Sequence, residues 1–157
     1  MCDLPDEHIE ELENLCVYVR STLKETYGAC IFFEHGMRNS GSGGCGIDHA
    51  HMHAVPVTAE GMLKILRQKF GGSGINTLAE IEGDLDQNSS YLFFENSSAK
   101  RYVFPVSNLP SQYMRKLVAE SIGKNDWDWR ECGHEPELIS TVQRLSSLIS
   151  PVTTTHK

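Results

Sequence analysis

The 157-residue chain lacks any long hydrophobic run. Its longest apolar stretches, Ala29–Phe33 and Tyr91–Phe94, are far shorter than the ~20 residues that a helix needs to cross a bilayer. Residues Met1–Glu7 contain neither a basic region nor an apolar core, so they do not resemble a secretory signal. We therefore expect a cytoplasmic protein that does not enter membranes.

Positive charge is also scarce, with 14 Lys and Arg against 21 Asp and Glu and a formal net charge of −7. Binding to nucleic acid or to a membrane surface usually needs a broad basic face, so the composition argues against both partners. A small anionic ligand needs only a local cluster of donors and remains compatible with this charge.

The five cysteines form no CxxC pair, and their number is odd. They are Cys2, Cys16, Cys30, Cys45 and Cys132. Without an export signal we expect reduced thiols, with Cys16 and Cys30 as core residues.

The length suits a single domain over residues 1–150, followed by a flexible C-terminal tail over 151–157. Hydrophobic periodicity predicts helices over 6–27, 58–70, 111–122 and 135–149. Strands are predicted over 29–34 and 47–57, with a hairpin formed by 91–95 and 101–106 and a short element near 78–81. This order predicts an α+β domain whose mostly antiparallel sheet is flanked by helices.

Capping residues and glycines set the expected ends of two helices. Thr58 and Ser111 are the predicted N-caps of the second and third helices. The run Gly71–Gly74 is predicted to end the second helix.

Three histidines, His49, His51 and His53, alternate along the predicted strand 47–57. Successive side chains in a strand point to opposite faces, so all three histidines share one face, with adjacent Cα atoms roughly 7 Å apart. The other face carries Ala50, Met52 and Ala54, which we expect to point toward helices. Chance produces such a pattern in on the order of one in a hundred chains of this composition. The alternative is a solvent-facing surface that happens to be rich in histidine.

A glycine- and serine-rich stretch, Gly36–Gly44, precedes the histidine strand. Glycines allow backbone N–H groups to close around a phosphate. An ordinary surface loop has the same composition, and both interpretations remain open.

The segment His49–Val55 matches the histidine-triad (HIT) pattern, in which three histidines alternate with apolar residues and a second apolar residue follows. Its surroundings follow the order of that family: an acidic helix start (LPDEHIEEL), an apolar strand (CIFFEHG), a glycine-rich loop (GSGGCG) and the triad strand. The chain therefore resembles the HIT-like superfamily over about residues 4–70.

The resemblance implies a nucleotide or nucleotide-conjugate substrate and chemistry at its α-phosphate. His51 would attack the phosphorus and form a covalent nucleotidyl-histidine, since neutral imidazole is a usable nucleophile near pH 7. The backbone carbonyl of His49 would orient His51, and His53 would bind the phosphate or assist the leaving group. The scheme requires no metal and no other cofactor. The resemblance also suggests a homodimer, because HIT proteins often pair through edge strands and helices.

Two positions before the triad depart from the family pattern. Cys45 and Gly46 stand where HIT proteins often have a Gln and a Ser or Thr that bind phosphate. The backbone N–H groups of Gly43, Gly44, Cys45 and Gly46 would then have to bind it instead.

The strand before the glycine-rich loop departs as well, because Glu34 and His35 stand where an Asn is common. We expect His35 either to face the phosphate or to be structural, and Glu34 to repel the phosphate. The strands that usually precede the first helix are missing, so we expect either a truncated piece of a longer protein or a partner subunit that completes the pocket.

Two other functions stay open. A metal-dependent hydrolase could use the same histidines, because alternating histidines on a strand are reasonable zinc ligands. The (β/α) barrel of the amidohydrolases, which open with a similar pair, needs about 250 residues and does not fit this chain. A non-catalytic nucleotide-binding module is the third alternative.

Weaker candidates lie outside the histidine strand. Cys132 and His134 could form half of a metal site or an ordinary loop. Trp127 and Trp129 could stack on a base or pack within a turn. The possible phosphate donors, for each of which a solvated surface is the alternative, are Lys100, Arg101 and Arg130.

Overall fold

Every strand pairing in the described sheet is antiparallel. The computed structural model describes residues 4–36, 51–83, 85, 90–107, 109–128, 130–146 and 148. The strands are β1 (Ile31–Gly36), β2 (His53–Val55), β3 (Ser73–Ile75), β4 (Ser90–Glu95) and β5 (Arg101–Val106). Their spatial order is β2-β1-β4-β5-β3. The predicted α+β class with an antiparallel sheet is confirmed.

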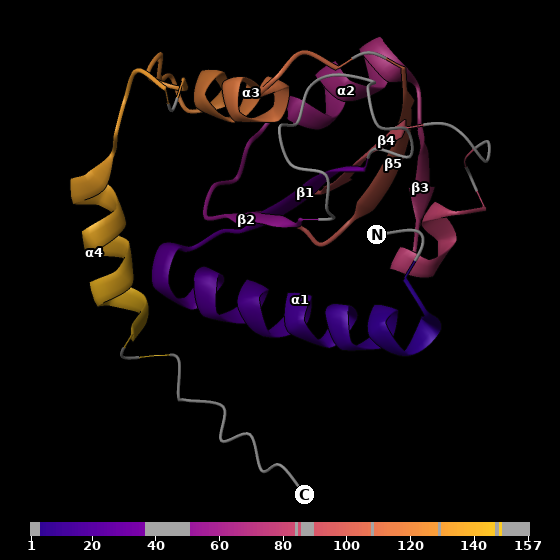
Figure 1. The fold of residues 1–157 in the computed structure, drawn as a ribbon, viewed down its shortest axis with the longest axis horizontal. Coiled ribbons are helices and arrows are strands. Elements are labelled where there is room, and N and C mark those ends of the chain that lie inside the picture. Colours follow the sequence, from indigo (N-terminus) through magenta and orange to yellow (C-terminus); the bar gives the residue numbers. More distant parts are fainter. Residues whose placement is uncertain are drawn as a thin grey trace, which may run out of the picture.

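Helices cover both faces of this sheet, as Figure 1 shows. They are α1 (Asp6–Tyr27), α2 (Met62–Phe70), α3 (Tyr113–Ser121) and α4 (Glu135–Ser146), with a short 3-10 helix η1 (Leu78–Ile81). The long helix α1 lies along one face, and α2 and α3 lie over the other (Figure 1). None of the described helices has both the length and the apolar character needed to span a membrane.

Strand alternation divides the core into two clusters. The cluster on the α2 and α3 side includes Ile31, Phe33, Leu92, Phe94, Phe104, Met114 and Leu117. The cluster on the α1 side includes Cys16, Leu23, Cys30, Phe32, Tyr91, Phe93 and Val103. Met52 and Ala54 pack against the α1 cluster, as the alternation of the histidine strand predicted.

Helix α1 coincides with its predicted range. Asp6 and Glu7 lie in its first turn, where they complement the helix dipole. Gly28 ends it with a left-handed φ of 83°. Cys16 is buried against the sheet, and burial is the main cause that raises the pKa of the Cys16 and Cys30 thiols to about 11. Both cysteines are therefore core residues, as predicted.

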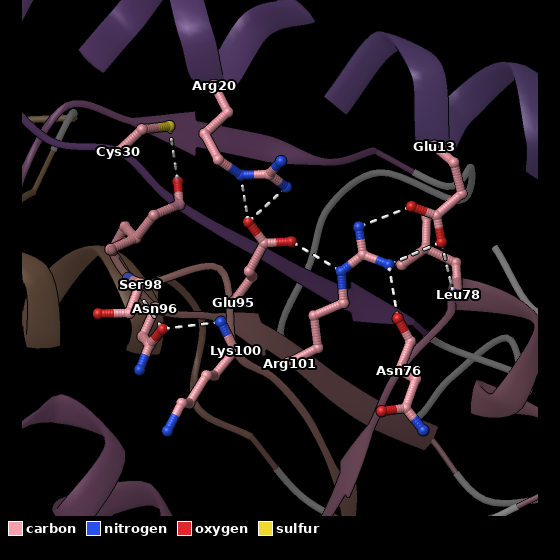
Figure 2. A network of polar contacts seen from close by, with 11 residues as sticks. Glu13, Arg20, Cys30, Asn76, Leu78, Glu95, Asn96, Ser98, Lys100 and Arg101 are labelled. Carbon is pink, nitrogen blue, oxygen red and sulfur yellow. Dashed lines mark hydrogen bonds and ion pairs between the residues drawn. The ribbon is translucent and has the colours of Figure 1, made fainter. Parts of the chain in front are cut away.

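A buried ionic network joins α1 to the β4–β5 hairpin (Figure 2). The Glu95 carboxylate is 1% exposed and accepts hydrogen bonds from Arg20 Nε at 2.7 Å and Arg101 Nε at 2.8 Å. The Arg101 guanidinium also donates to both carboxylate oxygens of Glu13, at 2.7 and 2.6 Å. Arg101 is thus a structural residue and not the phosphate donor that we considered. Lys100 lies exposed in the hairpin turn.

Two helix starts and one strand differ from the predictions. Helix α2 begins after Gly61, with φ of 85°, and not after Thr58. Helix α3 begins after Gln112, with φ of 61°, and not after Ser111.

Strand β3, which overlaps the end of the Gly71–Gly74 run, was not predicted from the sequence. Gly72 before β3 has φ of 81°, and a Cβ there would lie 2.6 Å from the Val103 carbonyl oxygen, so only glycine fits this approach to β5.

The described part of helix α4 spans Glu135–Ser146, within the predicted range 135–149, and none of its described residues is buried. It lies beside the C-terminal end of α1, away from the sheet (Figure 1). Arg144 lies over the Tyr27 ring at 5.9 Å, and Leu145 packs against the α1 cluster. Residues 151–157, predicted as a tail, lie outside the described part of the chain.

Candidate functional site

The β1–β2 pairing brings three of the sequence-selected histidines to one face of the sheet. Phe33 pairs with His53 in this antiparallel register. The pairing ends at His53, and His51 lies two residues before β2, near enough to His35 for its charge to affect the pKa of that ring. The ring centroids of His51 and His53 lie 5.0 Å apart at an interplanar angle of 74°. Two imidazoles at this spacing can engage one phosphate group.

The Phe33 ring forms the floor beneath His53. The two rings stack, with centroids 4.7 Å apart and an interplanar angle of 21°. Phe33 is 7% exposed and belongs to the core cluster on the α2 and α3 side, so the His53 ring rests on a fixed apolar surface. This contact restricts the orientation of His53 and removes water from one face of the ring.

Burial lowers the pKa of His35 and of His53, and it is the largest cause in both cases. The second cause is His51, whose positive charge when protonated disfavours a further charge nearby. For His53 the Arg115 guanidinium lowers the pKa further. At neutral pH both flanking imidazoles are therefore held in the neutral form.

Glu34 does not face the histidines, which corrects the expectation that it would repel a bound phosphate. It lies between Phe33 and His35 on β1, so its side chain points to the opposite, α1 side of the sheet. There it is fully buried, and Tyr91 Oη donates a hydrogen bond of 2.7 Å to its Oε2. The histidine face is thus separated from this carboxylate by the sheet itself.

Several predicted site residues lie outside the described part of the chain. They are His49, Gly43, Gly44, Cys45 and Gly46, together with Trp129 among the weaker candidates. Their proposed roles, with His49 as the orienting residue and the others as phosphate-binding amides, remain predictions.

Arg115 is the residue near the site that sequence reasoning missed. It lies on α3, where Met114 and Leu117 pack into the same core cluster as Phe33. Arg115 itself is exposed, and its charge reaches both His53 and Asp128. No local pattern reveals it, because Arg115 and His53 belong to different elements, α3 and β2, that lie far apart in the sequence.

The turn before α4 folds back against the start of α3. Gln112 Nε2 donates to Asp128 Oδ1 at 3.0 Å, and this bond is the main reason that the pKa of the Asp128 carboxyl is lowered. Lys116 Nζ lies 5.6 Å from the centre of the Trp127 ring. Trp127 is half-buried, so packing within a turn describes it better than a free stacking surface.

No three His, Cys, Asp or Glu side chains in the described residues gather closely enough to hold a metal ion. His134 Nε2 lies 3.1 Å from the Asp126 carbonyl oxygen, and its Nδ1 lies 4.0 Å from the Glu137 carboxylate. Cys132 has a free, partly buried thiol. These contacts assign His134 to the structure of the turn.

No protein-family model matches this chain, and no curated protein matches it in sequence. The functional argument therefore rests on the histidine motif and on the geometry of the described residues.

Proposed function

We propose that this protein is a nucleotide hydrolase or nucleotidyl transferase of the histidine-triad type, acting at the α-phosphate of a nucleotide conjugate. The observation that carries the proposal is the edge-to-face pair of His51 and His53, with centroids 5.0 Å apart, on a sheet face that also bears His35. Glu34, which is next to His35 in the sequence, is buried on the opposite side of the sheet, so this carboxylate does not oppose an anion at the histidine face.

In the proposed first step, a ring nitrogen of His51 attacks the α-phosphorus. A P–N bond forms, and the bond from phosphorus to the leaving group breaks. The leaving group departs with the bonding electron pair and takes up a proton from water or from the minor fraction of His53 that is protonated at neutral pH. The lowered pKa of His53 makes its protonated form a ready proton donor, whereas its neutral form can accept a hydrogen bond.

In the second step, water or another acceptor attacks the same phosphorus. The P–N bond breaks, the electron pair returns to His51, and the nucleoside monophosphate or the nucleotidylated acceptor is released. A proton from the attacking water passes to a neutral imidazole, for which His35 and His53 both remain available near pH 7. The Phe33 floor keeps His53 in one orientation through both steps.

The test is capture of the covalent intermediate by intact-protein mass spectrometry. The protein is mixed with diadenosine tetraphosphate or adenosine 5′-phosphoramidate in EDTA and denatured at mildly alkaline pH, because the P–N bond hydrolyses in acid. We expect an added mass of one adenylyl group, or turnover of the donor, in the wild type and not in His51→Ala. His8→Ala is the matched control, since His8 lies exposed on α1.

Other outcomes assign the site differently. Activity that EDTA abolishes and zinc restores would favour the metal-dependent hydrolase. Nucleotide binding without adduct or turnover would favour the non-catalytic binding module. An adduct that persists in His51→Ala would place the nucleophile elsewhere.

A further inference from the structure

A buried tyrosine crosses from β4 to β1 on the side of the sheet opposite to the histidines. Tyr91 pairs with Gly36 in the β1–β4 register, and its Oη donates a hydrogen bond of 2.7 Å to Glu34 Oε2. Tyr91 is 1% exposed and Glu34 is fully buried, so water does not compete for this bond. The bond therefore fixes the Tyr91 ring across the end of β1.

The same ring packs directly against Gly36. A Cβ at position 36 would overlap the Cε1 and Cζ atoms of Tyr91, so only glycine leaves room for the ring. An aromatic ring that covers a glycine on the neighbouring strand helps to fix the register of the two strands. Tyr91 thus holds Glu34 by a hydrogen bond and Gly36 by packing, and these three residues form the Tyr91 clamp.

His35 lies between the two residues of β1 that the Tyr91 clamp holds. It pairs with Leu92, whose side chain belongs to the core cluster on the α2 and α3 side, so the His35 ring lies on the face opposite to the clamp. Phe33, two residues along β1 on that same face, stacks on His53. The clamp therefore fixes the backbone on both sides of His35 and presents its imidazole beside the Phe33–His53 stack.

The helices on the two faces of the sheet carry opposite charges. Helix α1 has six carboxylates against two basic residues, a net charge of −4. Helix α2 has three basic residues and no carboxylate, and α3 has two basic residues and one carboxylate, so together they carry +4. Helices α2 and α3 cover the face that bears His35 (Figure 1). His35 thus lies on the side of the sheet that favours an anion, and the Tyr91 clamp lies on the other.

The second step of the proposed reaction needs a base on a particular side of the phosphorus. Because the attacking and leaving groups lie roughly in line at phosphorus, water approaches from the side opposite to the His51–phosphorus bond. His53 lies beside His51 on the same segment, with ring centroids 5.0 Å apart, whereas His35 comes from the neighbouring strand β1. Burial lowers the pKa of His35, so its ring is neutral near pH 7 and able to accept a proton.

We propose that His35 is the base that takes the proton of the attacking water, and that Tyr91 is a positioning residue for His35. As the water oxygen bonds to phosphorus, one water proton passes to a ring nitrogen of His35. The P–N bond breaks, and its electron pair returns to His51. The protonated His35 then gives its proton to solvent. The inference rests on the proposed function, because the water attacks the nucleotidyl-histidine formed in the first step.

The experiment measures formation of the adenylyl adduct separately from its decay. The protein is mixed with diadenosine tetraphosphate in EDTA, denatured in alkali at successive times and analysed by intact-protein mass spectrometry. In His35→Gln we expect formation within about twofold of the wild type and decay slower by about 100-fold, so that the adduct accumulates. His8→Gln is the matched control, since His8 lies exposed on α1, and should change neither rate.

Chemical rescue separates a base from a structural residue. Free imidazole should speed decay of the adduct at least about tenfold in His35→Ala and leave the wild type unchanged. Decay at the wild-type rate in His35→Gln, or slow decay in His35→Ala that imidazole does not restore, would overturn the role of His35 as the base while the nucleotidyl chemistry stands. If the wild type forms no adduct and turns over no donor, the proposed function fails and this assignment fails with it.

Tyr91→Phe tests the clamp, because it removes the hydroxyl group alone. We expect decay of the adduct to slow about fivefold, since the ring is no longer tied to Glu34, and formation to stay within about twofold. His35→Gln/Tyr91→Phe should decay no more slowly than His35→Gln, because Tyr91 acts through His35.

Tyr18→Phe is the matched control for the clamp, because Tyr18 lies half-exposed on α1, and it should leave both rates unchanged. Thermal melting establishes the temperature at which every variant is folded, and the rates are compared there. Decay that is unchanged in Tyr91→Phe, or effects of the two substitutions that multiply in the double variant, would overturn the positioning role of Tyr91.

Discussion

The Phe33 ring belongs to the hydrophobic core and also stacks on His53, so core packing affects the pKa of this imidazole. A core phenylalanine normally contributes burial alone, but here one face of its ring also limits the hydration of a titratable side chain. Burial is the main cause of the lowered His53 pKa, so the packing of β1 sets a chemical property of β2.

We predict that Phe33→Leu brings the pKa of His53 closer to its ordinary value near 6.5. The smaller side chain leaves the imidazole more hydrated, and hydration favours the charged form. Titration of the histidine ring resonances by NMR measures the change. His35 shares the neighbour His51 but not the Phe33 stack, so its pKa is the internal control.

A His53 pKa that is unchanged in Phe33→Leu would show that the stack does not cause the shift. The variant removes part of a core side chain, and we expect a loss of about 1 kcal/mol in the free energy of unfolding. Titration in the temperature range where the variant is fully folded keeps the two effects apart.

The buried pair of Glu34 and Tyr91 shows what sequence reasoning could not supply at this scale. The alternation of β1 correctly groups Phe33 with His35, and it also implies that Glu34 points the other way. The sequence does not say that the opposite side is a closed core with a tyrosine hydroxyl at 2.7 Å, because that partner lies 57 positions away. A local pattern therefore suggested repulsion where the fold provides burial.

At the scale of elements, segments with a clear apolar pattern could be predicted, down to the short helix η1 at Leu78–Ile81, whereas the glycine-rich strand β3 could not. Helix α1 and strand β5 match their predicted bounds, because one stripe of apolar residues and one alternating run define them. Strand β3 was missed, since a glycine run permits either a helix end or a strand, and only the close approach of Gly72 to β5 decides between them. The histidine strand was predicted over 47–57, and its described part forms β2 over His53–Val55.

The ionic network between α1 and the β4–β5 hairpin makes a prediction about these elements. Glu95→Gln removes the carboxylate between Arg20 and Arg101 and leaves two largely buried guanidinium groups without their shared counter-charge. We expect a loss of about 3–5 kcal/mol in the free energy of unfolding, measured by urea denaturation. Docking of α1 against the sheet should weaken more than pairing within the hairpin.

Glu10→Gln is the matched control for this prediction, because Glu10 lies exposed on the same helix. Its effect should stay within about 0.5 kcal/mol. Equal stabilities of the Glu95 and Glu10 variants would mean that the network contributes no more than a surface charge.

At the scale of the whole molecule, stability should depend on pH in two separate windows. The pKa values of His35 and His53 are lowered in the folded protein, so the unfolded chain binds protons first as the pH falls below about 6.5. The free energy of unfolding should therefore decrease from pH 7.5 toward pH 5.5. Stability that instead rises over this range would contradict the lowered pKa values of His35 and His53.

The second pH range in which stability changes is caused by Glu13. Its burial would raise the pKa, but hydrogen bonds from Arg101 and from the Leu78 backbone N–H outweigh burial and lower the pKa from 4.5. The stabilisation is present above pH 4.5 and is lost as the pH falls through the lower, folded value. Urea midpoints from pH 3 to pH 8 should show both windows. His35→Gln/His53→Gln should flatten only the upper one, and Glu13→Gln only the lower one.

The opposite charges of the two helix layers have a consequence for the approach of a ligand from solution. An acidic α1 on one side of the sheet and basic α2 and α3 on the other contribute an electric dipole across the sheet. An anion that diffuses toward the molecule is turned away by the α1 side and drawn to the histidine side before any contact is made. The orientation of the first encounter is thus set by charge at distances of about a Debye length, roughly 10 Å at 0.1 M salt, and should fade as salt is added.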